Sequence, residues 1–437
     1  MKKARSKPGG QASRASAASS HVPPAECTGA GVDGGAAKVD HVRLAHAIVA
    51  WFAGSGRQLP WRSPGPAGSD HPRDPYATLV SELMLQQTQV SRVVEKFKAF
   101  MAEFPTARAL AAADEARVLA LWSGLGYYRR ARLLHAAAKV ITAEHGGALP
   151  RDLEALHRLP GVGRYTAGAI ASIAMGQPVP LVDGNVARVL FRIHGKEAVH
   201  ADPNDMEWAW ACASSLVQSA DRSRVQIGNL NEGLMELGAT VCTPAAPACV
   251  FCPVRALCTA FATGRQEEIP LPKKPVQRSA MWCEAVLVFD DAQRVLVEQR
   301  PDRGMWAGLW QAPTFDHASA GPWSAGTVAA ALEIDDASRV HQLDRFRHQT
   351  THRDVTFTVW VVSPTPGEMQ RLGTGRRWVG AHDLDGLGLS NPQRRILTRK
   401  PGAAGPAFSP AQSLGKRANG RTASSGERPR NSRTLRS

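Results

Sequence analysis

The chain has 437 residues, of which 43% are hydrophobic, and this is enough for two or three buried cores. No apolar run approaches the length that spans a bilayer, and no apolar segment follows the basic start of the chain, so we expect neither a membrane protein nor a secretory signal. The formal net charge is +15 at pH 7, but most of this excess lies at the two ends.

The ends of the chain, residues 1–38 and 398–437, are predicted to be disordered basic tails. The first carries six Lys or Arg against two acids, and the second carries nine against one. Both are rich in Gly, Ala, Ser and Pro and nearly free of aromatic residues, which is typical of disorder. Such tails add salt-sensitive attraction to polyanions, but they do not indicate a specific groove.

Residues 39–262 are predicted to form a mainly helical domain. Leu79, Leu83, Val90 and Phe97 recur at helical spacing, and Gly or Pro interrupts the pattern at intervals of about 10 to 20 residues. Apart from short apolar pieces such as residues 179–182, this region lacks the alternation of apolar and polar residues that is typical of β-strands.

Glu82 lies in the segment SELMLQQTQV at residues 81–90, where a run of four polar residues, 86–89, interrupts an otherwise apolar helical stripe. On a helix, Glu82 and Gln86 share one face, while Leu79 and Leu83 point to the core. A solvated glutamate on an amphipathic helix is the default interpretation of an isolated Glu. The neighbouring polar residues favour a functional role instead.

A glycine hairpin, LPGVGRY at residues 159–165, precedes a helix of small residues. Such a turn directs backbone N–H groups outward at a helix start, where an anion binds without base contacts. The sequence-neutral anion that fits is a nucleic-acid phosphate, so Gly161 and Gly163 are predicted to contact a DNA phosphate. The alternative is an ordinary helix–turn–helix loop.

Asp183 follows the hairpin closely, in the segment LVDGN at residues 181–185. A carboxylate at this position can serve chemistry on the strand that the hairpin holds. The alternative is an N-cap for a helix from Val186, and the two roles are compatible.

Four of the seven cysteines fall within 17 residues, with the spacing C-x6-C-x2-C-x5-C: Cys242, Cys249, Cys252 and Cys258. This pattern indicates a metal site in a reducing compartment rather than a disulfide framework. Four close thiolates suit a [4Fe–4S] cluster or a four-cysteine zinc site. Zinc ribbons usually show two C-x2-C pairs and this chain has one, so the spacing favours iron–sulfur.

The region after the cysteines is predicted to be a linker, residues 263–278, followed by a smaller α+β domain, residues 279–397. Prolines among basic residues make the linker semi-rigid and exposed. In the domain, the patterns predict a hairpin with strands at 285–289 and 295–297, a helix near 325–332 and a strand at 355–362.

Together the hairpin, Asp183 and the cysteine spacing resemble the helix–hairpin–helix DNA glycosylases that carry an iron–sulfur cluster. That superfamily includes the endonuclease III-like enzymes and the adenine DNA glycosylases of the MutY type. The segment at residues 81–90 and the extra C-terminal domain favour the adenine glycosylases. Tyr165 does too, because the bifunctional lyases place a Lys there to form an imine, which a phenol cannot do.

The resemblance implies a monofunctional enzyme, a cytoplasmic and nucleoid-associated monomer, that removes adenine opposite 8-oxoguanine or guanine in double-stranded DNA. Glu82, kept protonated by an apolar setting, is implied to be the general acid. Asp183, kept ionised near the hairpin, is implied to stabilise the oxocarbenium ion that forms on the sugar. Asn185 and Tyr165 are implied to position these groups.

The resemblance also implies how the DNA is bound. Trp61, Arg62 and Glu232 correspond to residues that line the adenine pocket. Gln87 and Tyr127 correspond to residues that enter the base stack when the target base is extruded. The alternative for Tyr127 is a core tyrosine. The loop between Arg62 and Asp74 is longer than the family usually shows and is expected to lie on the surface.

The C-terminal domain resembles a Nudix fold of the MutY type. The glutamate cluster that a hydrolytic Nudix enzyme needs is missing after residues 304–310, so hydrolysis of a diphosphate is not expected. The segment at residues 346–352 resembles the loop that reads 8-oxoguanine. Thr351 and His352 are therefore predicted to bind the oxidised base, while Thr350 replaces the usual aromatic and cannot stack.

Three other functions fit the sequence less well. An endonuclease III-like glycosylase/lyase is disfavoured by Tyr165 and by the extra domain. A Nudix hydrolase fused to a DNA-binding module is disfavoured by the missing glutamates. A non-catalytic iron–sulfur DNA-binding protein is disfavoured by the presence of both Glu82 and Asp183.

Overall fold

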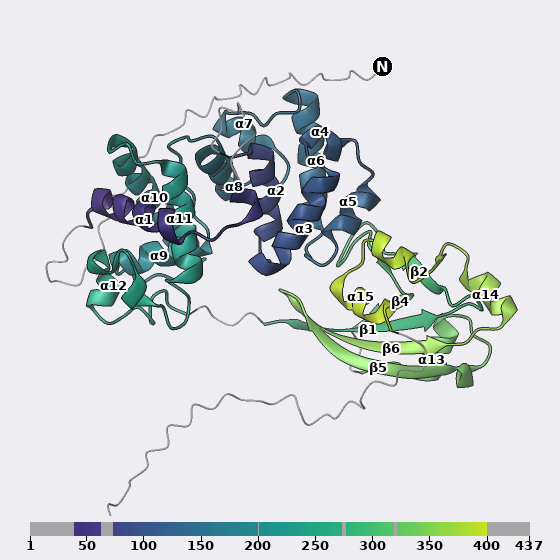
Figure 1. Ribbon diagram of the computed structural model, residues 1–437. Helices are drawn as coiled ribbons and strands as arrows, with labels where there is room; N and C mark the ends of the chain where they lie inside the picture. Colours follow the sequence, from purple (N-terminus) through teal and green to yellow (C-terminus); the bar gives the residue numbers. More distant parts are fainter. Residues whose placement is uncertain (1–38, 63–72, 200, 273–276, 319–320, 400–437) are drawn as a thin grey trace, which may run out of the picture. The chain divides into compact units, whose positions relative to one another are not determined.

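The computed structural model describes residues 39–62, 73–199, 201–272, 277–318 and 321–399 (Figure 1). The predicted tails, apart from residues 398 and 399, lie outside these residues, as does most of the loop between Arg62 and Asp74. The chain divides into two compact units. The first holds the described residues up to Gln277 with 297–311 and 379–395, and the second holds 278–296, 312–378 and the residues from Ile396.

The first unit is built mainly of helices, as predicted. Their bounds are α1 (His41–Ser55), α2 (Pro75–Leu85), α3 (Val90–Glu103), α4 (Ala107–Ala111), α5 (Glu115–Trp122), α6 (Arg129–Glu144), α7 (Leu153–Arg158), α8 (Arg164–Ala169), α9 (Gly184–His194), α10 (Pro203–Arg222), α11 (Ile227–Thr240) and α12 (Thr259–Ala262). A π-helix, Ile170–Ala174, continues α8, and short 3-10 helices lie at Pro60–Arg62, Cys249–Phe251 and Arg255–Leu257.

Aspartate side chains set the starts of many of these helices. Asp40 accepts hydrogen bonds from the backbone N–H groups of the first turn of α1, and Asp74 does so for α2. Asp202 caps α10, where Pro203 takes the first helical position. A carboxylate at an N-cap satisfies N–H groups that have no partner inside the helix and interacts favourably with the helix dipole.

Two hydrophobic cores support the first unit. One joins α1, α9, α10 and α11, with Leu44, Phe191 and Leu230 fully buried. The other joins α2, α3, α5 and α6 around Trp122 and Phe100, whose rings meet edge to face. Leu79 and Leu83 are buried in this second core, as predicted.

The second unit is an α+β fold, as expected. After residue 278 the chain forms β1 (Ser279–Val288), β2 (Val295–Gln299), β3 (Trp310–Gln311), β4 (Thr314–His317), α13 (Ala325–Ala331), β5 (Val340–Gln349), β6 (Arg353–Val362), α14 (Pro366–Leu372), β7 (Arg377–Val379) and α15 (Asn391–Leu397). Of these, β3 and most of β2 and α15 belong to the first unit. One sheet has the order β4-β1-β6-β5, in which β1 and β6 are parallel, and the other has the order β3-β2-β7.

The predicted hairpin at residues 285–297 is only partly correct. The turn forms, because the Asp290 N–H donates to the Arg294 carbonyl at 3.0 Å and Phe289 pairs with Val295. The strands do not continue as one ladder, however. β1 is paired on its two edges by β4 and β6, and β2 joins the other sheet. The predicted helix at 325–332 and strand at 355–362 are confirmed as α13 and β6.

The linker prediction is also only partly correct, because its first part packs against the helical unit. Ile269 is buried, and its carbonyl accepts a hydrogen bond from Arg192 Nε at 2.7 Å. The Leu271 N–H donates to the carbonyl of Ala198. Ile269, which is followed by Pro270, therefore packs against the helical unit before the chain continues toward β1.

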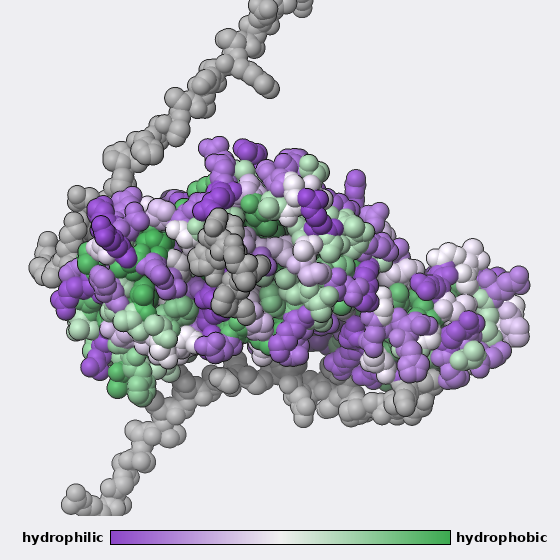
Figure 2. All heavy atoms as spheres, turned by 45° about the horizontal axis from the view of Figure 1, so that its top comes forward, coloured by the Kyte–Doolittle hydropathy of each residue, from purple (hydrophilic) through white to green (hydrophobic). Residues whose placement is uncertain are grey.

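The face in Figure 2 mixes hydrophilic and hydrophobic residues without a broad apolar area. Among the described residues, no helix combines the length and the apolar character needed to cross a membrane.

Candidate active site

A cavity of about 910 Å³ lies in the first unit, among α2, α8, α9, α11 and the hairpin before α8. Ten of the residues selected from the sequence line it: Trp61, Arg62, Glu82, Gln87, Gly161, Gly163, Tyr165, Asp183, Asn185 and Glu232. These residues come from segments far apart in the chain, so the fold brings the predicted chemistry together in one place.

Glu82 lies near the end of α2 and is almost fully buried. Its Oε2 accepts a hydrogen bond of 2.5 Å from the Tyr165 hydroxyl. Burial raises the pKa of Glu82 to about 7, and the nearby carboxyl of Asp183 adds to this, whereas the Tyr165 hydrogen bond lowers it. The side chain can therefore carry a proton near neutral pH.

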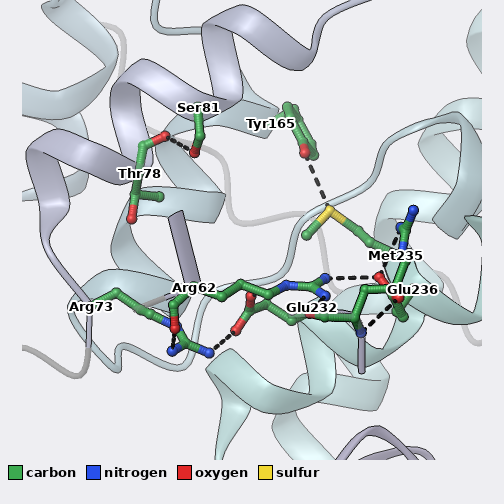
Figure 3. Close-up of polar contacts among 9 residues, drawn as sticks. Arg62, Arg73, Thr78, Ser81, Tyr165, Glu232, Met235 and Glu236 are labelled. Atoms are coloured by element: carbon green, nitrogen blue, oxygen red, sulfur yellow. Dashed lines mark hydrogen bonds and ion pairs between the residues drawn. The ribbon is translucent and has the colours of Figure 1, made fainter. Parts of the chain in front are cut away.

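Tyr165 is the second residue of α8, directly after the hairpin. Its hydroxyl also lies 3.2 Å from the sulfur of Met235 (Figure 3). Burial, followed by the negative charges of Glu82 and Asp183, raises the pKa of Tyr165 well above its ordinary value. The phenol thus stays protonated and acts as a hydrogen-bond donor toward Glu82.

Asp183 is the N-cap of α9, which begins at Gly184, slightly before the predicted start. Its carboxylate accepts hydrogen bonds from the Val186 N–H at 2.7 Å and from Asn185 Nδ2 at 3.0 Å. Burial raises the pKa of Asp183, while these two donors act in the opposite direction and favour the ionised form. The predicted capping role is confirmed, and it leaves the carboxylate at the cavity wall.

Arg188 connects this carboxylate region with the cysteine loop. Its Nη2 donates to Asn185 Oδ1 at 2.9 Å, and its Nε donates to the carbonyl of Cys242 at 2.8 Å. Arg188 is a site residue that no motif in the sequence indicates. Its position one helical turn after Gly184 places it on the same face of α9 as the start of the helix, and this spacing can be recognised in the sequence.

Arg62 and Glu232 belong to a larger ion-pair network (Figure 3). Arg62 Nε lies 3.0 Å from Glu232 and its Nη2 lies 2.9 Å from Glu236. Arg57 binds Glu236 with its Nε at 2.6 Å, and Arg73 binds Glu232 at 3.0 Å. The two glutamates are buried, so each needs these cations. Glu232 therefore reaches the cavity already held by two arginines.

Sequence reasoning missed Arg57, Arg73 and Glu236. Glu236 follows Glu232 by one helical turn on α11, so the spacing in the sequence predicts that the two glutamates share one face of the helix. Its partner Arg57 is 179 residues away, and no local pattern links the two.

The residues predicted to enter the base stack lie on two turns. Gln87 is exposed and lines the cavity, directly after α2. Tyr127 is 51% exposed and lies outside the cavity lining, in the turn before α6. The alternative of a core tyrosine does not apply to Tyr127, because the neighbouring Tyr128 is the buried one.

Trp61 lies in the 3-10 helix Pro60–Arg62 and is half-buried. Its ring meets that of Phe97 edge to face, with 5.5 Å between centroids. This contact with α3 fixes a flat apolar surface at the cavity wall.

The four clustered cysteines converge on a second, smaller cavity beside α9 and α11, lined by Cys242, Cys249, Cys252 and Cys258. Arg192 Nη1 lies 3.3 Å from the sulfur of Cys242 and also donates to the carbonyl of Thr243 at 2.7 Å. Four sulfur donors and a neighbouring cation fit a negatively charged metal–thiolate centre.

A further group of metal-ligand types lies in the helical core. Single ligand atoms of His41, His194 and Cys212 lie within 4.8 Å of one another. Burial lowers the pKa of His194 to about 4, so its ring is neutral, and its Nε2 lies 3.2 Å from Cys212 Sγ. A hydrogen bond between these two side chains accounts for that contact, and the four cysteines fit a metal better.

Thr351 and His352 lie in the exposed turn between β5 and β6. Thr350 holds this turn, because its backbone N–H donates to the carbonyl of Arg353 and its hydroxyl accepts from the N–H of Arg353 at 3.0 Å. The hydroxyl of Thr350 is thus committed to the backbone.

Comparison with known families gives two matches along the chain. The model of the HhH-GPD superfamily base excision DNA repair protein matches residues 80–209, and that of the NUDIX domain matches residues 284–399. The first match spans Glu82, the hairpin and Asp183, and the second spans the turn with Thr351 and His352.

Curated relatives match most of the chain. The adenine DNA glycosylase of Homo sapiens is 33% identical over 405 residues, which cover 80% of this chain and 72% of the relative. The adenine DNA glycosylase of Buchnera aphidicola subsp. Acyrthosiphon pisum is 31% identical over 354 residues, covering 80% and 95%. A solved structure of a thermostable thymine-DNA glycosylase is 26% identical, covers 51% of this chain and 97% of that chain, and has a TM-score of 0.43.

Proposed function

The chain belongs to the adenine DNA glycosylase family and is a base excision repair enzyme that hydrolyses N-glycosidic bonds; we propose that its substrate is adenine opposite 8-oxoguanine or guanine in double-stranded DNA. The observation that carries this proposal is the cavity shared by two interacting carboxyls, Glu82 and Asp183, of which Glu82 has a pKa of about 7. Two carboxyls in different protonation states suit the cleavage of a glycosidic bond.

Glu82 acts first as the general acid. Its carboxyl donates a proton to N7 of adenine while the bond between N9 and the sugar carbon C1′ breaks, and the bonding electrons leave with the base. The Glu82 carboxylate then accepts a proton from a water molecule, whose oxygen bonds to C1′. Tyr165 supports both steps, because its hydroxyl holds Glu82 at 2.5 Å.

Asp183 stabilises the positive charge that develops on the sugar. Its carboxylate accepts hydrogen bonds from the Val186 N–H and from Asn185, which fix its orientation and favour the ionised form against the burial that raises its pKa. A carboxylate next to the sugar also offers transient bonding to C1′ before water adds.

Some of the residues proposed to contact DNA line the same cavity, whereas Tyr127, Thr351 and His352 lie outside its lining. Gly161 and Gly163 offer backbone N–H groups to a phosphate, and Gln87 and Tyr127 fill the space that an extruded base leaves. Trp61, Arg62 and Glu232 surround the extruded adenine. In the second unit, Thr351 and His352 bind 8-oxoguanine on the opposite strand.

We further propose that the enzyme releases the base without cutting the strand. The residue after the hairpin that a lyase uses as an amine is Tyr165 in this chain, and a phenol forms no imine with the sugar. The family membership by itself leaves this point open, so it needs a separate test.

The four cysteines are proposed to hold a [4Fe–4S] cluster, which would supply a rigid, charged anchor for the loop at residues 242–258. Metal analysis should give about four iron atoms per chain with matching sulfide. One zinc per chain without sulfide would contradict the proposal.

The central test is single-turnover release of adenine from a duplex with adenine opposite 8-oxoguanine. The wild-type chain should release adenine and Glu82→Gln should release none, while Glu95→Gln on the exposed face of α3 serves as the matched control. An active Glu82→Gln enzyme would contradict the assignment. Borohydride trapping tests the absence of lyase chemistry: efficient covalent capture of DNA by the wild-type chain would overturn it.

A further inference from the structure

Arg130 is a buried arginine near the start of α6 that lies between two turns of the first unit. Only 7% of its surface is exposed. It is absent from the lining of the large cavity. Burial lowers its pKa to about 10, so the guanidinium is still charged at neutral pH. A buried charge is costly unless hydrogen bonds compensate for the lost water, so the partners of Arg130 indicate what it holds in place.

One amino group of Arg130 binds the end of α2. Nη1 lies 2.6 Å from the carbonyl of Leu83, 2.9 Å from that of Met84 and 2.6 Å from that of Gln86. These are carbonyls that a helix end leaves without partners inside the helix. The next residue in the chain is Gln87.

The other amino group binds the turn before α6. Nη2 lies 3.3 Å from the carbonyl of Leu125 and 3.1 Å from that of Gly126, and the next residue is Tyr127. Nη2 also lies 3.1 Å from the hydroxyl of Thr88, which itself lies 3.3 Å from the carbonyl of Leu125. The guanidinium and Thr88 thus join the two turns.

The residues that follow these carbonyls have strained backbones. Gln87 has φ of 56° and Tyr127 has φ of 47°, both in the left-handed region that disfavours residues with side chains. Such conformations persist when the surroundings hold them. The guanidinium of Arg130 also lies over the ring of Tyr127, 5.5 Å from its centroid.

We propose that Arg130 is a positioning residue that holds Gln87 and Tyr127 at a fixed separation, so that both enter the base stack together when adenine is extruded. This inference rests on the proposed function, which assigns those two residues to the stack. Arg130 itself does not touch the reacting atoms.

The planar guanidinium is required because its two amino groups serve different turns. A lysine keeps the positive charge but has one ammonium group, which cannot reach both sets of carbonyls in the same geometry. Arg130→Lys therefore separates loss of the bridge from loss of charge. Thr88→Val removes one part of the bridge without changing the buried arginine, and it replaces Arg130→Lys as the decisive variant if the latter does not fold.

The experiment measures base extrusion and chemistry separately. Extrusion is followed by the fluorescence of 2-aminopurine at the target position, in chains that also carry Glu82→Gln. Chemistry is followed by single-turnover adenine release. Arg130→Lys should lower both the extruded fraction and the release rate, the latter roughly tenfold, because charge-assisted hydrogen bonds are lost. Arg117→Lys, which affects an exposed ion pair with Glu103, should leave both unchanged.

A double-mutant cycle distinguishes positioning from general support of the fold. If Arg130 acts through Tyr127, then the double variant with Arg130→Lys and Tyr127→Ala should release adenine only slightly more slowly than Tyr127→Ala alone. Losses that multiply, or unchanged extrusion in Arg130→Lys and in Thr88→Val, would overturn the inference while the proposed function stands. A wild-type chain that releases no adenine would overturn the proposed function, and this inference with it.

Discussion

At the scale of single residues, the site places a carboxyl where burial works against its ionisation. Glu82 has a folded-state pKa of about 7, above its ordinary value of 4.5, so the folded protein binds this proton more tightly than the unfolded chain does. The proton that the chemistry needs is thus available near neutral pH. The consequence is a loss of stability as the pH rises from about 4.5, where the unfolded carboxyl ionises, to about 7, where the buried carboxyl ionises.

Glu82→Gln removes this ionisation and should stabilise the protein at high pH. At pH 8 the variant should be more stable than the wild-type chain by roughly 1–3 kcal/mol, and at pH 5 by much less. Denaturant unfolding at the two pH values checks this, with Glu95→Gln as the exposed control. Equal differences at both values would contradict a buried, titrating Glu82.

Tyr165→Phe should shift the pH dependence of the reaction. The Tyr165 hydroxyl favours the ionised form of Glu82, so its removal raises the pKa of Glu82 further. The general acid then stays protonated to higher pH, and the pH of half-maximal release should move upward, although the maximal rate falls because Glu82 loses its support. Single-turnover rates between about pH 5 and 9 measure both effects. A midpoint that moves downward would contradict the hydrogen-bond assignment.

At the scale of elements, the close approach of α9 and α11 sets the position of Asp183. A Cβ on Gly238 of α11 would meet the Cβ of Asn185 at 2.7 Å and its carbonyl oxygen at 3.0 Å. The carbonyl of Gly238 also accepts from Arg188 Nη2 at 2.8 Å. Since the backbone of Asn185 cannot give way locally, an added methyl group must push the start of α9 away.

Gly238→Ala should therefore reduce stability by roughly 1–3 kcal/mol and slow adenine release by at least about tenfold. Gly54→Ala is the matched control, because Gly54 lies in α1 with open space around its Cα and should tolerate the change. Thermal unfolding and single-turnover release measure the two effects. Wild-type release by Gly238→Ala would show that α9 does not need this close contact.

The elements also show how far sequence reasoning reaches. The helical spacing of Leu79 and Leu83 predicted α2, because local apolar spacing determines which helix face is buried. The hairpin at residues 285–297 was partly wrong, since strand partners depend on which edges other strands occupy, and β6 is distant in sequence from β1. The pair of Arg57 and Glu236 was missed for the same reason: the contact exists only after α1 and α11 pack together.

At the scale of the whole molecule, the residues proposed for the chemistry and those proposed to recognise the opposite base belong to different units. The cavity with Glu82 lies in the first unit, whereas Thr351 and His352 lie on a turn of the second. Most of the positive charge of the chain lies in its ends, which add salt-sensitive attraction to DNA. Each function should therefore be separable by mutation in the full chain.

Thr351→Val combined with His352→Ala should reduce the preference for adenine opposite 8-oxoguanine over adenine opposite guanine. Two lost hydrogen bonds to the oxidised base predict a fall of roughly tenfold in the ratio of the two release rates, with the rate opposite guanine unchanged. Thr350→Ser is the control, because a serine hydroxyl still accepts from the N–H of Arg353 and preserves the turn. If both rates fall equally, then the turn supports the fold or general DNA binding rather than reading the oxidised base. An unchanged ratio would mean that 8-oxoguanine is recognised elsewhere in the chain.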